Sequence, residues 1–248
     1  MTNHVLVRDD AAVRTIRMNR PEKRNALTAA MYADMARAIR EAEAAGIRCL
    51  LIAGSTDAFS AGNDLQDFMT AGSEDAFRPV MDFLAALAEC PLPLVAAVQG
   101  VAVGIGTTML MHCDQVIASD EATFATPFVS LGLVPEAASS LLAPRLMGLQ
   151  RAFSLLVMGE RLDARTAAEC GIVTHVRPAN EVDIHAQQIA KKIAALPPEA
   201  VRLSRRLIRG EPQDTLARIQ EEAALFKARL ASPEAQAAFA AFFARKPG

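Results

Sequence analysis

The sequence has no long uninterrupted run of apolar residues. Apolar side chains make up 52% of its 248 residues, yet no stretch approaches the roughly 18 residues of a membrane-spanning helix. The N-terminal segment MTNHVLVRDD lacks the apolar centre of a secretory signal, and the C-terminal ARKPG is not a peroxisomal tripeptide. These absences predict a cytoplasmic protein that does not enter a membrane.

Cysteine and histidine are both scarce, with four of each. The cysteines form no C-x-x-C pair and lie among apolar residues, which predicts reduced, buried thiols. The histidines are too scattered to give metal-ligand spacing, so we predict no metal site. His112, beside Cys113, is interpreted as the end of a buried helix. The eight residues are Cys49, Cys90, Cys113, Cys170, His4, His112, His175 and His185.

Charge is nearly balanced, with a formal net charge of -2. Binding of nucleic acid requires a clustered basic surface, which this balance does not favour. One arginine run has helical spacing, with leucines opposite, and is interpreted as a solvated or interface face of a helix. Its members are Arg202, Arg205, Arg206 and Arg209.

Strand-like and helix-like patterns alternate through the first part of the chain. The predicted strands cover residues 4–8, 13–18, 48–53, 93–98, 115–118 and 172–176. One predicted helix runs from the N-cap Thr28 to Gly46, a second covers residues 77–89, and a third follows Gly106 and ends at His112. Further predicted helices begin at Glu136, Leu149, Asp163, Glu181, Pro198, Thr215 and Pro233. This order predicts an α/β core over residues 1–183, with a mainly parallel sheet, and a helical region over residues 184–248.

Residues 100–106 form a glycine-rich turn between a predicted strand and a predicted helix. The spacing is G-x-x-x-G-x-G, which does not match the G-x-G-x-x-G of a dinucleotide-binding fold. Two interpretations stay open from this segment alone. The glycines allow close helix–sheet packing, or they let backbone N–H groups approach a ligand oxygen. A second loop, residues 59–65, also follows a buried strand and could provide a converging N–H group.

Several motifs occur in a characteristic order. N-R-P-E-K-R-N-A-L precedes F-S-A-G-N-D-L, P-L-V-A-A-V-Q-G-V-A-V-G-I-G, C-D-Q-V-I-A-S-D-E-A-T-F and L-G-L-V-P-E. Together they resemble the crotonase (enoyl-CoA hydratase/isomerase) family over almost the whole chain. The resemblance implies an α/β fold, the crotonase (ClpP-like) spiral of ββα units with a C-terminal helical trimerisation region. It also implies homotrimers or hexamers built as dimers of trimers.

The resemblance further implies a binding site for acyl-coenzyme A, with coenzyme A as part of the substrate and no permanently bound cofactor. The backbone N–H groups of Asn63 and Ile105 are expected to form an oxyanion hole. Lys23 and Arg24 are expected to meet the phosphates, and Lys227 or Lys246 could reach the coenzyme A of a neighbouring subunit. The adenine and pantetheine path is expected to involve Ala26, Ser60, Ala61, Gly62, Asn63, Asp64 and Leu65.

Hydratases of this family resemble one another in carrying two glutamates, and this chain departs at both positions. Thr108 and Phe128 stand there, and both are expected to line the substrate pocket. Hydration needs a base that activates water and an acid that protonates the α-carbon. Neither Thr108 nor Phe128 can serve near neutral pH, so hydratase activity is disfavoured.

Glu136 lies in L-G-L-V-P-E-A-A-S-S, which resembles the isomerase branch of the family. A local interpretation makes it a first-turn helix glutamate, which the helix dipole favours. Its apolar neighbours instead indicate a buried carboxyl with a pKa raised toward neutrality. The resemblance then implies a Δ3,Δ2-enoyl-CoA isomerase. Glu136 would take a proton from C2, the oxyanion hole would hold the dienolate, and Glu136 would return the proton to C4. Phe128 would help to exclude water.

Two other interpretations remain. The same oxyanion hole could serve hydration, thioester hydrolysis or another lyase reaction of acyl-CoA. A catalytically silent acyl-CoA-binding protein is the non-enzyme alternative, and it predicts a Glu136 side chain that faces solvent. RNA binding, known among relatives of the fold, is disfavoured by the net charge.

Overall fold

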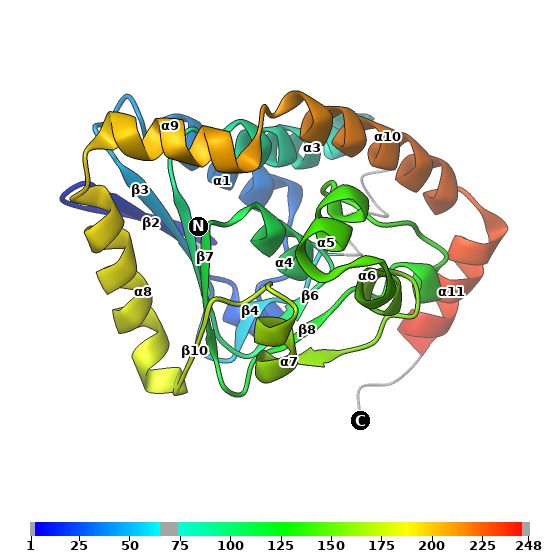
Figure 1. Ribbon diagram of the computed structural model, residues 1–248. Helices are drawn as coiled ribbons and strands as arrows, with labels where there is room; N and C mark the ends of the chain where they lie inside the picture. The colour runs from blue at the N-terminus through cyan, green and yellow to red at the C-terminus, as the bar shows by residue number, and fades with distance from the viewer. Residues whose placement is uncertain (1–2, 65–73, 245–248) are drawn as a thin grey trace.

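The computed structural model describes residues 3–64 and 74–244. A large sheet has the strand order β1-β2-β3-β5-β7-β10, and a smaller one has the order β4-β6-β8-β9 (Figure 1). β1 is antiparallel to β2 and β9 is antiparallel to β8, whereas the other pairs are parallel. The strands are β1 Val5–Asp10, β2 Val13–Met18, β3 Cys49–Ala53, β4 Ala58–Ser60, β5 Leu94–Val98, β6 Val101–Val103, β7 Gln115–Ser119, β8 Thr123–Ala125, β9 Leu162–Asp163 and β10 His175–Arg177.

Helices cover both faces of the large sheet. β3 and β5 are buried along their whole length, and their side chains alternate between two hydrophobic clusters. Leu50 and Ile52 belong to the larger cluster, which includes residues of α1 (Ala29–Arg40) and α3 (Glu74–Glu89). Leu51 belongs to a smaller cluster with residues of α8 (Ala179–Ala194). This two-sided burial explains why the central strands are continuous apolar runs in the sequence.

The C-terminal helix α10 (Gln213–Leu230) reaches back to the N-terminal half. α10 packs on both α3 and α5, and α11 packs on α10. The helices are α1 Ala29–Arg40, α3 Glu74–Glu89, α4 Ile105–Thr108, α5 Ser139–Met147, α6 Leu149–Leu156, α7 Ala164–Glu169, α8 Ala179–Ala194, α9 Pro198–Arg209, α10 Gln213–Leu230 and α11 Pro233–Ala244, with short 3-10 helices η1 Pro21–Lys23, η2 Met109–His112 and η3 Val129–Leu131. Among the described residues, no helix is both long and apolar enough to cross a bilayer.

The predicted α/β class is confirmed, and three local predictions were wrong. The helix capped by Thr28 ends at Arg40, because the chain then turns and Ile47 N donates to the carbonyl of Ala42. Residues 101–103 form β6, one of several three-residue strands too short to leave a period in the sequence. The helix predicted from Glu136 begins at Ser139. The predicted division at residues 183 and 184 falls within α8 and stays a prediction.

Candidate active site

Two glycine-containing loops meet at the carboxyl ends of β4 and β6. These strands pair in parallel, so the loops that follow them emerge at the same edge of the small sheet. A Cβ atom on Gly62 would lie 2.9 Å from the carbonyl oxygen of Val103. A Cβ atom on Gly106 would lie 2.7 Å from the carbonyl oxygen of Ser60. The close approach of the two loops therefore depends on glycine.

The two N–H groups predicted as oxyanion donors lie in these loops. Asn63 forms an isolated parallel bridge with Leu27, in which Leu27 N donates to Gly62 O (2.8 Å) and Asp64 N donates to Leu27 O (2.9 Å). In such a bridge the N–H of Asn63 itself points away from Leu27. Ile105 is the first residue of α4, where an N–H has no intrahelical acceptor. Within the described residues, neither N–H donates to another backbone group.

The segment predicted to meet coenzyme A packs directly on the Asn63 loop. Ala61 N donates to the carbonyl of Arg24 (2.8 Å), and Ser60 Oγ donates to the carbonyl of Asn25 (2.9 Å). Asn25 is fully buried, and its side-chain amide donates to Ala58 O (2.8 Å). The structure thus brings together two segments that are separated by more than thirty positions in the sequence.

The predicted coenzyme A residues differ in exposure. Lys23 and Arg24 are exposed, Ala26 is half-buried, and Ser60 is fully buried. Asp64 forms an ion pair with Arg20 (2.7 Å), which was not predicted from the sequence as a site residue. Of the remaining candidates, Leu65 and Lys246 lie outside the described residues, and Lys227 is exposed near the end of α10.

Glu136 is a buried carboxyl in the loop before α5. Its exposed fraction is only 7%, and burial raises its pKa to about 7, with a smaller contribution from the charge of Glu222. Its Oε1 atom has no hydrogen-bond partner among the described residues. The helix-start interpretation was wrong, because Ala137 and Ala138 adopt left-handed backbone angles (φ 61° and 56°) before α5 begins. The carboxyl therefore sits outside the helix, with one oxygen available.

The side chain of Asn63 connects its own loop, residues 61–64, to Glu136. This loop is called the oxyanion loop below. The interaction of the Asn63 amide with the Glu136 carboxyl lowers the pKa of Glu136 and so opposes the effect of burial. Asn63 Oδ1 accepts a hydrogen bond from the hydroxyl of Tyr32, a fully buried residue of α1. Burial and the charge of Glu136 raise the pKa of Tyr32, so its hydroxyl keeps its proton. No sequence pattern indicates this role, because Tyr32 shares the apolar face of its helix with Met31 and Met35.

Thr108 and Phe128 are both buried. The Phe128 ring lies beside the turn that precedes Ile105, where its Cε1 would be 3.9 Å from a Cβ atom on Gly104. Thr108 Oγ1 has no hydrogen-bond partner within the described residues. Neither side chain can exchange a proton near neutral pH, so the two positions add no acid or base to the site.

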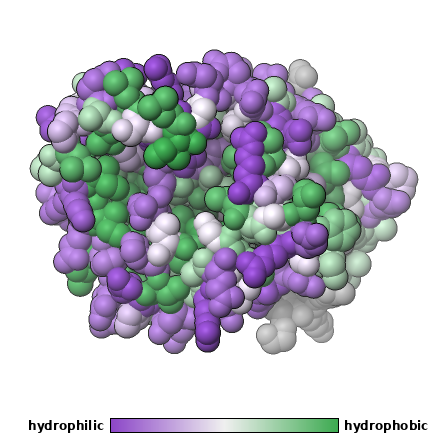
Figure 2. Space-filling view, viewed as in Figure 1, coloured by the Kyte–Doolittle hydropathy of each residue, from purple (hydrophilic) through white to green (hydrophobic). Residues whose placement is uncertain are grey.

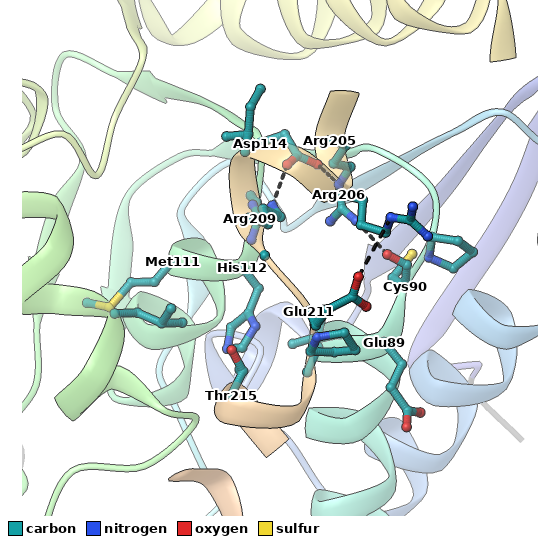
Figure 3. A pocket seen from close by; sticks show the side chains of 18 of the residues that line it. Glu89, Cys90, Met111, His112, Asp114, Arg205, Arg206, Arg209, Glu211 and Thr215 are labelled. Atoms are coloured by element: carbon teal, nitrogen blue, oxygen red, sulfur yellow. Dashed lines mark hydrogen bonds and ion pairs between the residues drawn. The ribbon is translucent and has the colours of Figure 1, made fainter. Parts of the chain in front are cut away.

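The arginine run lines a separate cavity of about 480 Å³, shown in Figure 3. There Asp114 accepts hydrogen bonds from Arg205 (2.7 Å) and Arg209 (2.6 Å). The solvated alternative therefore fails for these two arginines of α9, which form ion pairs with Asp114, while the interface alternative stays a prediction. The lining residues do not include Glu136, Asn63 or Ile105, so this cavity is distinct from the candidate active site.

Comparison with known proteins gives a match over most of the chain. Residues 8–247 match the family model described as enoyl-CoA hydratase/isomerase. Enoyl-CoA delta isomerase 2 of Rattus norvegicus is 38% identical over 98% of this chain and 64% of the rat protein. The chain thus spans just under two thirds of that relative's length. Enoyl-CoA delta isomerase 3, peroxisomal, of Mus musculus is 34% identical over 98% of this chain and 78% of the mouse protein.

Solved structures of similar proteins superpose closely on this chain. An enoyl-CoA hydratase/isomerase from Pseudoalteromonas atlantica T6c superposes with a TM-score of 0.93 at 41% identity, covering 99% of both chains. OdaA of Pseudomonas aeruginosa has a TM-score of 0.93 at 40% identity, covering 98% of this chain and 100% of its own. From the ordered motifs, the fold and these matches together, the chain belongs to the enoyl-CoA hydratase/isomerase (crotonase) family.

Proposed function

We propose that this protein is a Δ3,Δ2-enoyl-CoA isomerase in which Glu136 is the single base and acid. The observation that carries the proposal is a buried carboxyl with a pKa of about 7, whose Oε1 has no hydrogen-bond partner among the described residues. Asn63 interacts with this carboxyl, and in the described part of the chain its own N–H donates to no backbone group. The rat and mouse relatives are named as enoyl-CoA delta isomerases, which supports the same activity.

The reaction follows from the chemistry of these groups. The thioester oxygen of a 3-enoyl-CoA accepts hydrogen bonds from the N–H groups of Asn63 and Ile105, which acidifies the protons on C2. Glu136 removes one of them, and the dienolate places negative charge on the oxygen between the two donors. Glu136 then delivers the proton to C4 and leaves the trans-2-enoyl product. A pKa near neutrality suits a group that acts first as base and then as acid.

Hydration of a 2-enoyl-CoA is the competing reaction. It needs a second proton-transferring group, and Thr108 and Phe128 offer none at the positions where hydratases resemble one another. The buried ring of Phe128 beside Gly104 also favours a site without water. We therefore expect conversion of 3-enoyl-CoA to exceed hydration of 2-enoyl-CoA.

Coenzyme A is proposed to bind along the joined segments. The exposed side chains of Lys23 and Arg24 suit the phosphates, and Ala26 with residues 60–64 suits the adenine and pantetheine, with Leu65 and Lys246 as further proposed contacts. The hydrogen bonds between Arg24 and Ala61 and between Asn25 and Ser60 support this surface as one preformed unit.

A trimer, or a hexamer of two trimers, is the proposed assembly. Figure 2 shows apolar surface where α9 lies in Figure 1, and exposed apolar side chains there and on α6 support an interface. They include Leu149 (73% exposed), Phe153 (57%), Leu207 (83%) and Ile208 (85%). Sedimentation of the purified protein tests this assembly. The cytoplasm stays the proposed location, although the mouse relative is named peroxisomal.

The Glu136→Gln variant tests the proposed function. Gln keeps the size of the side chain but cannot accept the C2 proton, so conversion of 3-enoyl-CoA, followed by absorbance of the conjugated thioester, should fall by roughly 100- to 10,000-fold. Binding of a saturated acyl-CoA should change little. If the variant kept most of the turnover, Glu136 would be excluded as the base. If the wild type hydrated 2-enoyl-CoA faster than it converted 3-enoyl-CoA, the competing reaction would be favoured.

A further inference from the structure

The peptide group between Ala137 and Ala138, one residue after Glu136, is held at both ends by buried side chains. The carbonyl oxygen of Ala137 accepts a hydrogen bond from His112 Nε2 (2.8 Å). The N–H of the same peptide group, on Ala138, donates to Glu222 Oε2 (2.6 Å). His112 ends η2 and Glu222 lies in the middle of α10, so two distant segments meet at this one group.

The backbone at this point needs support. Ala137 and Ala138 both have left-handed φ angles, which are unfavourable for residues with a Cβ atom. Such conformations persist where surrounding contacts fix them, and they cluster at functional sites. Glu136 immediately precedes the two alanines, so the direction of its side chain depends on how this turn is held.

Glu222 does more than hold one N–H group. It is 5% exposed, and its Oε1 accepts hydrogen bonds from the backbone N–H (2.9 Å) and the hydroxyl (2.5 Å) of Ser140. Arg218, one turn earlier on α10, also donates to the Ser140 hydroxyl (3.0 Å). Glu222 thus binds the turn and the first residues of α5 together. Its neighbour Glu221 instead forms an exposed ion pair with Arg218.

His112 is suited to the opposite end of the peptide group. It is 2% exposed, and burial lowers its pKa to about 4, so the ring is neutral near pH 7. Because a carbonyl oxygen only accepts, the proton of the neutral ring must lie on Nε2. A neutral donor here holds the carbonyl without placing a positive charge near Glu136.

We propose that Glu222 and His112 are positioning residues that fix the direction of the Glu136 carboxyl by holding the Ala137–Ala138 peptide group from both sides. This proposal rests on the proposed isomerase function, in which Glu136 must reach both C2 and C4 of one substrate. Loss of either contact should lower kcat and leave KM little changed, because the proposed coenzyme A contacts lie on other loops.

Glu222 has a second, electrostatic effect that a purely structural contact would lack. The groups that act on Glu136 are the Asn63 amide, which lowers its pKa, and the charge of Glu222, which raises it. Burial raises the pKa of Glu222, whereas the donors of Ser140 and Ala138 from the α5 segment and Arg218 from its own helix lower it and favour the charged form. Removing the Glu222 charge should therefore move the acid limb of the rate–pH profile to lower pH.

The experiment compares Glu222→Gln, His112→Leu and the double variant with wild type, using Glu221→Gln as the matched control on the same helix. Each single variant should lose about 10- to 100-fold in kcat, since a displacement near 1 Å can cost roughly 100-fold. His112→Gln, which keeps an N–H donor, should retain more turnover than His112→Leu. The double variant should lose much less than the product of the single losses, because both contacts hold one group. Glu221→Gln should match wild type.

Two results would overturn the proposal: Glu222→Gln with wild-type kcat and pH profile, or single losses that multiply in the double variant. A wild type that does not convert 3-enoyl-CoA would instead overturn the proposed function. In that case the pKa of Glu136, measured by ¹³C NMR of its carboxyl in the free protein, decides the positioning role. It should fall in Glu222→Gln and stay unchanged in Glu221→Gln, and an unchanged value in both would reject the role.

Discussion

The hydroxyl of Tyr32 donates a hydrogen bond to the side-chain oxygen of Asn63. An amide side chain has an accepting and a donating end, so occupying the oxygen turns the NH₂ group toward Glu136. The same residue supplies the backbone N–H proposed to bind the thioester oxygen. Tyr32 therefore couples the orientation of the proposed base to that of the oxyanion loop.

Replacing Tyr32 with Phe tests this coupling. The ring keeps its packing against Phe83 (5.4 Å between ring centres), while the donor to Asn63 is lost. A net hydrogen bond contributes about 1 kcal/mol, so kcat for 3-enoyl-CoA should fall about 5-fold with KM nearly unchanged. Steady-state kinetics of the two proteins check it, and an unaltered kcat would show that the Asn63 amide is oriented without Tyr32.

Replacing Asn63 with Ala separates its side chain from its backbone. The N–H proposed for the oxyanion hole remains, but the donor to the Glu136 carboxyl is lost. That donor stabilises the charged form and lowers the pKa of Glu136, so its removal should raise this pKa above its value of about 7. The acid limb of the kcat/KM profile should move to higher pH, opposite to the shift expected for Glu222→Gln. A shift to lower pH would contradict the assignment.

Features with local signals could be predicted from the sequence, and the candidate site residues depended on ordered motifs. The N-cap of Thr28, confirmed by its bond from Met31 N (3.3 Å), needs only four neighbouring residues. The candidates Asn63, Ile105 and Glu136 came from motifs in order. The roles of Tyr32 and Glu222 could not be predicted, because their partners are distant in the sequence. Tyr32 has the pattern of a core residue, and Glu222 beside Glu221 has the pattern of a solvated helix.

The error at Glu136 has a physical cause. A proline followed by a glutamate is typical of a first helical turn, where the fixed φ and the helix dipole favour both residues. Here the contacts of His112 and Glu222 with the Ala137–Ala138 peptide group override that local preference, and α5 begins only at Ser139. No window of sequence around Glu136 contains either partner, so the carboxyl's position could be predicted only as buried.

Replacing Gly62 with Ala should separate the two loops of the proposed oxyanion hole. The new Cβ would lie 2.9 Å from the carbonyl oxygen of Val103, and this oxygen belongs to backbone that cannot yield easily. Loss of one oxyanion donor costs about 100- to 1,000-fold, so kcat should fall by that order. Gly46→Ala is the matched control, because Gly46 also has a positive φ (77°) but nothing within 4 Å of an added Cβ. Equal losses in both variants would assign the effect to backbone strain.

The raised pKa of Glu136 also predicts how stability depends on pH. The pKa is about 7 in the folded protein against 4.5 for an unperturbed glutamate, so between these values the folded state binds more protons than the unfolded state. Its contribution to stability is therefore present below pH 4.5 and is lost as the pH rises through 7. Glu136→Gln has no such loss. Relative to wild type, the variant should gain roughly 3 kcal/mol in free energy of unfolding between pH 4.5 and pH 8. Urea unfolding at both pH values measures this gain, and Glu221→Gln controls for the loss of a glutamate as such. An equal difference between variant and wild type at the two pH values would mean that Glu136 ionises in the folded protein as it does in the unfolded chain, and that burial does not tune it as a base.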